Sequence, residues 1–239
     1  MTPLVPILLG LVALVVGAVL LRSFGPSYRV GRLLASTPGV SIADAVALAG
    51  SSGSPRYVKV AGRIDAEADF EDDAHRPLVF RRTRLEVRAG SGWRSLDDKR
   101  EAVPFQINEG LDSIGVVHAD LDAGLVVLPR ESVGTAAEVP ELVPAGTDPA
   151  ATVRLQVQHV STVEHAIVLG VPSLDAQGAA QLGAGLGRPL ILTTLQTDEA
   201  MRILAAEHAR RPLVAAIALA VGLILLTAGI AWAAIAAMP

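Results

Sequence analysis

Histidines are the residues of this chain best suited to acid–base or metal chemistry, and their spacing supports neither. The five are His75, His118, His159, His165 and His208, and no two have the spacing of a helical zinc site. His159 and His165, with Glu164 beside the second, can meet on neighbouring strands, but no third group is placed to converge on them. A GxSxG nucleophile elbow is also missing. We therefore predict no catalytic residue, no metal ligand and no cofactor.

Carboxylates and arginines form two further clusters. Six carboxylates fall within the nine residues 65–73, but without the central glycine and closing glutamate of a calcium loop, so a solvated loop is favoured over a cation site. The arginines are Arg81, Arg82, Arg84 and Arg88. They can contact an anionic partner or a lipid head group, or pair internally with Glu86 and the acidic loop, which the sequence favours. Alternation predicts a solvent-exposed face carrying Arg82, Arg84, Glu86 and Arg88.

The composition excludes several classes of site. The 239 residues contain no cysteine, so disulfides, thiolate zinc sites, iron–sulfur clusters and a thiol nucleophile are excluded. The net charge of −4 gives no reason to expect nucleic acid as a partner, because such binding usually needs a basic face.

Two uncharged apolar runs bracket all the charged residues. The C-terminal run, residues 213–238, has 26 residues and the N-terminal run, residues 4–21, has 18. A membrane-spanning helix needs about 20 apolar residues. We predict two transmembrane helices, at 4–21 and 213–236. For the first, a cleaved secretory signal is the alternative, disfavoured because no basic side chain precedes the run.

Residues beside the two runs indicate an orientation and a packing mode. Arginines flank the inner ends of both runs, at Arg22, Arg29, Arg32, Arg202, Arg210 and Arg211. The positive-inside rule then predicts a multi-pass protein of the cell membrane whose middle domain is cytoplasmic. Small residues at Gly10, Gly17, Gly222 and Gly229 permit close helix packing, within the chain or between chains of a homo-oligomer.

The middle of the chain reads as mainly β. We expect a juxtamembrane helical segment at 27–50, with Ser41 capping its short helix, a β-rich domain at 56–196, and an amphipathic helix at 197–211 that begins at a Thr197 cap. Expected strands are 57–64, 78–89, 104–108, 114–119, 125–129, 153–160, 164–171 and 190–194. Residues 138–151 read as a flexible connection and 175–187 as a small-residue loop. This α+β pattern predicts a small barrel or sandwich with a few short helices.

Several short motifs, in this order, resemble one known family. They are Thr37-Pro38 before a short helix, the strand 58–64 with Gly62, the segment RPLVFR at 76–81, Trp93, Pro104-Phe105, and residues 160–170 with Glu164 and Gly170. Together with the flanking helices they resemble the GIDE family, which includes the mitochondrial ubiquitin ligase MULAN and many prokaryotic members. In that family a β-rich "beside a membrane" (BAM) domain lies between two transmembrane helices.

The resemblance implies a membrane-anchored module and not a ligase. Ligases of the family carry a zinc-binding RING after the second helix, whereas this chain ends at Pro239 and has no cysteine. We therefore expect a non-catalytic interaction or sensing module, with the lipid bilayer and an unidentified protein as partners. The alternatives are an enzyme with an unrecognised site on the β domain, and an oligomeric membrane scaffold.

Overall fold

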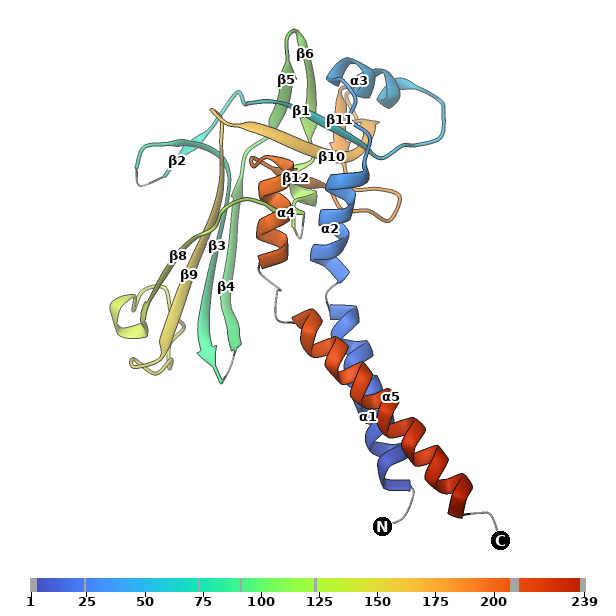
Figure 1. The fold of residues 1–239 in the computed structure, drawn as a ribbon. Helices are drawn as coiled ribbons and strands as arrows, with labels where there is room; N and C mark the ends of the chain where they lie inside the picture. Colours follow the sequence, from blue (N-terminus) through green and yellow to red (C-terminus); the bar gives the residue numbers. More distant parts are fainter. Residues whose placement is uncertain are drawn as a thin grey trace. The chain divides into compact units, whose positions relative to one another are not determined.

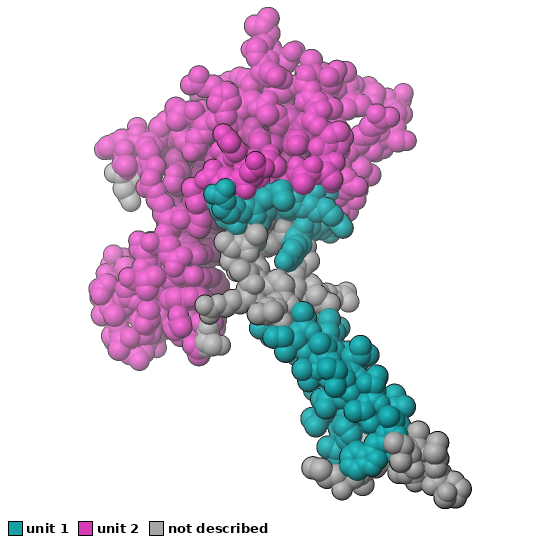
Figure 2. Space-filling model, viewed as in Figure 1, with its two compact units in different colours: residues 1–33, 201–239 teal, residues 34–200 magenta. Residues whose placement is uncertain are grey.

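The computed structural model describes residues 4–23, 25–72, 74–90, 92–122, 124–206 and 211–236. It divides into two compact units, shown in Figure 2. The first unit, Met1–Leu33 with Met201–Pro239, is helical where it is described; the second, Leu34–Ala200, holds the β-sheets. The predicted α+β class with a small barrel is confirmed.

Five strands of the second unit close into the barrel, in the order β1-β5-β6-β11-β10, with β10 pairing back onto β1. Their bounds are Val58–Asp65 (β1), Phe105–Glu109 (β5), Asp112–Val116 (β6), His165–Leu174 (β10) and Ala180–Gly183 (β11). Neighbours are antiparallel except β6 and β11, which are parallel. Two short strands, β12 (Ile191–Thr193) and β7 (Leu125–Val126), extend the sheet from β10 (Figure 1).

Alternating apolar side chains fill the barrel. Along β1, Val58, Val60, Gly62 and Ile64 are buried, while the residues that alternate with them are more exposed. A Cβ on Gly62 would lie 2.5 Å from the carbonyl oxygen of Asn108 on β5, so only glycine lets the two strands approach this closely. A glycine within a strand indicates either a bulge or a close backbone approach, and at Gly62 the structure shows the close approach.

One helix contributes to this core. Helix α3, Ile42–Gly50, buries Ile42 and Ala45 in the same cluster as the barrel strands. Ser41 caps it as predicted, because its Oγ accepts a hydrogen bond of 3.1 Å from the backbone N–H of Asp44.

The remaining strands of this unit form a curved half-barrel. Strand β3 (Pro77–Ala89) is central and antiparallel to all its neighbours: β4 (Gly92–Ala102), β9 (Thr152–Ser161) and the short β2 (Phe70–Glu71). Strand β8, Arg130–Thr135, pairs with the far side of β9. Val79, Phe80 and Val160 of this sheet belong to the barrel's core, so the two sheets share one hydrophobic interior.

Residues 136–151 pack on the end of the half-barrel that carries Leu85 and Val87, away from Val79 and Phe80 in the shared core. Leu85, Val87, Ala136 and Val153 form a second buried cluster there. The segment contains the turn η2 (Ala136–Glu138) and is held by backbone hydrogen bonds such as Ala136 N–H to the carbonyl of Ala151, at 2.9 Å. A stretch predicted as a plain connection thus closes a small core.

The sequence misses four strands, β2, β4, β8 and β11; the two-residue β2 lies in the predicted acidic loop. Both faces of β4 and β8 are partly exposed, and both strands are almost entirely polar. They therefore lack the apolar alternation from which a half-buried strand is predicted. Strand β11 is short and lies in the predicted small-residue loop. The predicted strand at 114–119 is also wrong at its end, because β6 stops at Val116 and a 3₁₀ turn (η1, His118–Asp120) follows.

The helices outside the sheets are α1 (Leu4–Ser23), α2 (Gly25–Ser36), α4 (Thr197–Ala206) and α5 (Arg211–Ala236). Among the described residues, α5 alone is long and apolar enough to cross a membrane, over Val214–Ala233; α1 has the shorter apolar stretch Val5–Val19. The predicted helix at 197–211 needs correction, because Arg211 belongs to α5. Residues 207–210 lie outside the described part of the chain.

Candidate functional site

The four glycines singled out for helix packing all lie where α1 meets α5. A Cβ on Gly10 would lie 2.8 Å from the carbonyl oxygen of Gly222, and one on Gly222 would lie 2.9 Å from the backbone nitrogen of Leu14. A Cβ on Gly17 would meet the side chain of Leu219, and one on Gly229 the backbone of Ile7. The partner numbers fall along one helix as they rise along the other, so the helices are antiparallel.

The contact repeats every seven residues. Gly10 and Gly17 are buried on α1, and Ala215, Gly222 and Gly229 on α5, while most of the other described side chains are exposed. A seven-residue repeat keeps one seam of each helix on its partner, and small residues let the backbones approach closely. The structure thus places these glycines in a contact within one chain.

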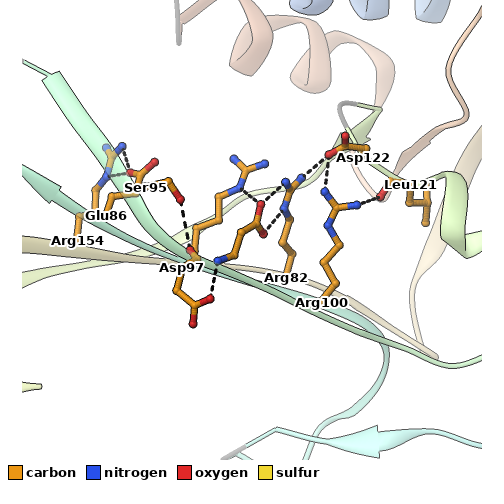
Figure 3. Close-up of polar contacts among 10 residues, drawn as sticks. Arg82, Glu86, Ser95, Asp97, Arg100, Leu121, Asp122 and Arg154 are labelled. Carbon is orange, nitrogen blue, oxygen red and sulfur yellow. Dashed lines mark hydrogen bonds and ion pairs between the residues drawn. The ribbon is translucent and has the colours of Figure 1, made fainter. Parts of the chain in front are cut away.

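The arginines predicted to contact a partner separate onto two faces of the half-barrel. Arg82, Arg84 and Arg88 share one face, and Arg81 points to the other, because successive strand residues alternate. Figure 3 shows the first face, where a ladder of ion pairs crosses β3, β4 and β9.

Arg82 is the centre of this ladder. Its Nε and Nη2 donate to the carboxylate of Asp98 at 2.8 and 2.6 Å, and its Nη1 donates to Asp122 at 3.0 Å. Arg82 is only 5% exposed, so the predicted solvent-exposed face is wrong at this residue. The hydrogen bonds from Arg82 lower the pKa of Asp98, and those carboxylates raise the pKa of Arg82.

Further pairs extend the ladder at both ends. Arg84 lies 3.6 Å from Asp98, and Arg100 donates to Asp122 at 2.7 Å. Beyond them Arg154 pairs with Glu86 at 2.5 Å.

The indole of Trp93 ends the ladder. The guanidinium of Arg88 lies 5.3 Å and that of Arg154 4.5 Å from the centre of its ring. These two contacts account for both arginines within the sheet.

The arginines predicted to bind a partner or lipid therefore have internal partners. The acids that pair with them come from β4 and from Asp122, and not from Glu86 or the acidic loop as expected; among the described ion pairs, Glu86 pairs with Arg154 instead. Within that loop, Asp72 instead pairs with Arg76, which lowers the Asp72 pKa, and Asp65 accepts hydrogen bonds from Gln106 and Asn108. Asp73 lies outside the described residues.

A hollow of about 440 Å³ opens on the opposite face of the half-barrel. Its cationic residues are Arg76 before β3, Arg81 on β3, Arg130 on β8 and His159 on β9. Arg81 and His159 are direct cross-strand neighbours, and Arg130 stands opposite Val157 on the other side of β9. Thr83, Ser132, Leu78, Leu155 and Val157 complete most of the wall.

The electrostatics of this hollow are positive. Arg76 is paired with Asp72 and Arg81 with Glu101, at 2.6 Å. The ion pairs of the described residues include none for Arg130, which is exposed. Burial lowers the pKa of His159, and the nearby Arg76 and Arg130 lower it further. These effects favour the neutral imidazole of His159 over the imidazolium.

The two histidines considered as a metal pair lie in different sheets. His159 faces Arg81 on β3, whereas His165 faces Arg63 on β1. Glu164 instead accepts a hydrogen bond of 3.1 Å from the backbone N–H of Ser161. Within the described part of the chain no His, Asp and Glu side chains gather as a metal site would require, and His208 lies outside that part.

The sequence could not predict the hollow, because its residues come from three separated segments, 72–83, 130–132 and 155–159. Arg130 lies on β8, a strand without apolar alternation, so nothing placed it near His159. Comparisons with protein-family models, with curated proteins and with solved structures find no match to this chain.

Proposed function

We propose that this protein is a membrane-anchored interaction or sensing module, without chemistry of its own, in which α1 and α5 hold the β unit at a cell membrane. The observation that carries the proposal is the helix pair. The apolar α5 is packed along α1 through glycines spaced by seven residues, while its Leu223, Ile224 and Ile230 are each more than half exposed. Exposed apolar side chains on a helix are compatible with the hydrocarbon core of a lipid bilayer.

The proposal extends to two spans and an orientation. The apolar stretch of α1, shorter than a typical span, reaches the membrane as the partner of α5, and the arginines beside both helices favour a cytoplasmic β unit. This arrangement of helix, β-rich domain and helix is that of the GIDE family. The proposed relation to that family rests on the motif order described above. The proposed module includes no ligase activity, because none of these 239 residues is a cysteine that could bind the zinc of a RING.

Membrane extraction tests the anchoring. After lysis and alkaline carbonate washing, the full chain should remain in the membrane pellet and leave it only with detergent. Recovery in the carbonate supernatant would refute the proposal.

Single cysteines test the orientation in the same cells. The chain has no cysteine, so Ser52→Cys, at an exposed position, provides a unique thiol on the β unit. It should resist a membrane-impermeant maleimide in intact cells and react after permeabilisation. Thr2→Cys is the opposite control, which should react in intact cells; labelling of Ser52→Cys before permeabilisation would contradict a cytoplasmic β unit.

A pull-down of the full chain from native membranes tests the interaction itself. A protein partner retained at stoichiometric amount supports the module, whereas turnover of a substrate by the purified chain would favour an enzyme instead.

A further inference from the structure

The hollow on the half-barrel carries more positive charge than its own acids neutralise. Two of its three arginines have a carboxylate partner, Asp72 for Arg76 and Glu101 for Arg81. Arg130 adds a third guanidinium, and the described ion pairs give it no acid. One full positive charge therefore remains at the wall of a cavity large enough for a small ligand.

His159 can add a second charge when an anion enters. It is half-buried, and its Nε2 lies 3.5 Å from Nη1 of Arg76. Arg76 and Arg130 lower its pKa in addition to burial, while Glu164 and Asp72 act in the opposite direction. A bound anion would offset the two arginines and favour the imidazolium, so proton uptake by His159 would accompany binding.

The geometry of the donors matches a group with several acceptor oxygens. Guanidinium groups reach the hollow from the segment before β3, from β3 and from β8, and the imidazole from β9. A carboxylate has two oxygens to offer, whereas a phosphate monoester has three, and arginine forks bind phosphate in a bidentate manner. Hydroxyls of Thr83 and Ser132 and apolar Leu155 and Val157 also line the wall, which suits the neutral body of such a ligand. Leu78, Ala74 and Asp72, the partner of Arg76, complete the lining.

We propose that this hollow binds a phosphate monoester between Arg130, Arg76, Arg81 and His159. The phosphate can belong to a soluble metabolite or to a lipid head group, which present the same chemistry. The inference rests on the proposed role of the β unit as an interaction module, and it does not depend on the anchoring. Loss of phosphate binding would leave the carbonate-extraction result unchanged, so the two proposals fail separately.

Calorimetric titration of the full chain in non-ionic detergent with inorganic phosphate is the first test. Arg130→Gln should weaken binding roughly tenfold, the effect of one lost charge-assisted hydrogen bond. The control is Arg94→Gln, which removes the same charge from an exposed position of β4 that does not line the hollow; it should change affinity less than twofold. No phosphate binding by the parent chain, or equal weakening by both variants, would overturn the proposal.

Sulfate is the probe that tests the part played by His159. The charge of the sulfate ion stays constant between pH 5 and pH 8, so a change in affinity over this range comes from the protein. Sulfate affinity should rise as the pH falls from 8 to 6, and His159→Gln should abolish this dependence while keeping binding at pH 8. Asp72, whose pKa is lowered by its bonds to Arg76, stays ionised throughout this range. A dependence that persists unchanged in His159→Gln would remove His159 from the site.

Binding experiments with lipid micelles distinguish the two sources of phosphate. Mixed micelles containing phosphatidic acid are compared with micelles of phosphatidylcholine alone, with inorganic phosphate as competitor. Preferential binding of the phosphatidic acid micelles, lost in Arg130→Gln, identifies a lipid head group. Binding of inorganic phosphate without that preference identifies a soluble ligand. Both results support the site, and binding of neither probe refutes it.

Discussion

At the scale of single residues, the arginines of β3 show how a strand can carry charge and still hold a sheet together. The sequence predicts that internal ion pairs are favoured over a partner, and the contacts of Arg81, Arg82 and Arg84 agree with that preference. The sequence could not identify the acids. Asp98 and Glu101 lie on β4, which was not predicted because it is mostly polar, and Asp122 is distant in sequence. Arg82 can be buried because it is paired with these acids. The acids are brought next to it by the folded structure, including the register of β3 and β4, which the sequence alone does not give.

Replacing Arg82 should destabilise the β unit. Arg82→Gln leaves Asp98 and Asp122 without their shared partner; both acids are partly exposed, so we expect a loss of about 1–3 kcal/mol, below that for a fully buried pair. The melting temperature of the full chain in detergent, followed by circular dichroism, should fall by roughly 3–10 °C. Arg81→Gln is the matched control, because its partner Glu101 is half exposed and such pairs contribute less than about 1 kcal/mol. Equal shifts would contradict a central role for Arg82.

The same pair predicts an acid dependence of stability. Hydrogen bonds from Arg82 lower the pKa of Asp98 in the folded state, so the carboxylate contributes stability above the unfolded pKa of about 4. This stability is lost as the pH falls through the lower, folded pKa. Asp98→Asn should therefore be less stable than the parent at pH 7 and lose less between pH 4 and pH 2.5. Melting temperatures across this range test it, with the exposed Glu141→Gln as control; parallel curves for Asp98→Asn and the parent would contradict the assignment.

At the scale of elements, apolar alternation decided which strands the sequence could reveal. Strands β1, β3, β5, β9 and β10 all carry buried apolar side chains and were all predicted, with ends wrong by a few residues. Strands β4 and β8 are edge-like and polar, so the pattern is absent from them. Closure of the barrel could not be predicted at all, since it depends on β1 pairing with β10 more than 100 residues away.

Gly62 tests the other pairing of β1 in the barrel, that with β5. In Gly62→Ala the new Cβ would lie 2.5 Å from the carbonyl oxygen of Asn108 and force β1 and β5 apart. We expect a loss of about 1–3 kcal/mol, as for other overpacked sites. Gly92→Ala is the control, because no atom lies within 4 Å of its added Cβ and its backbone is not left-handed. If the melting temperatures of the two variants fall equally, the close approach of β1 and β5 is not what Gly62 provides.

At the scale of the whole molecule, the sequence predicted small residues for helix contact and left open whether that contact lies within one chain or between chains. The structure pairs α1 with α5 of the same chain, with Gly222 against Gly10 and Leu14. Nothing in either apolar run could settle this, because glycine spacing is equally suited to both arrangements. If the glycines join two helices of one chain, replacing them should not change the number of chains in a particle. In an oligomeric scaffold, the same replacement should reduce that number.

Gly222→Leu should separate the two helices without changing the number of chains in a particle. The new side chain would collide with the backbone of α1, whose Leu14 nitrogen lies 2.9 Å from the site of the Cβ. Ala220→Leu is the matched control, because Ala220 is exposed on the opposite side of α5 and a leucine there meets only lipid or detergent. We expect the first variant to melt at a lower temperature in detergent and to be cleaved faster by protease, and the second to match the parent in both. Light scattering should give the same mass for all three. If instead Gly222→Leu converts a larger particle to a smaller one at unchanged melting temperature, the glycines join separate chains, and the oligomeric scaffold is the better description.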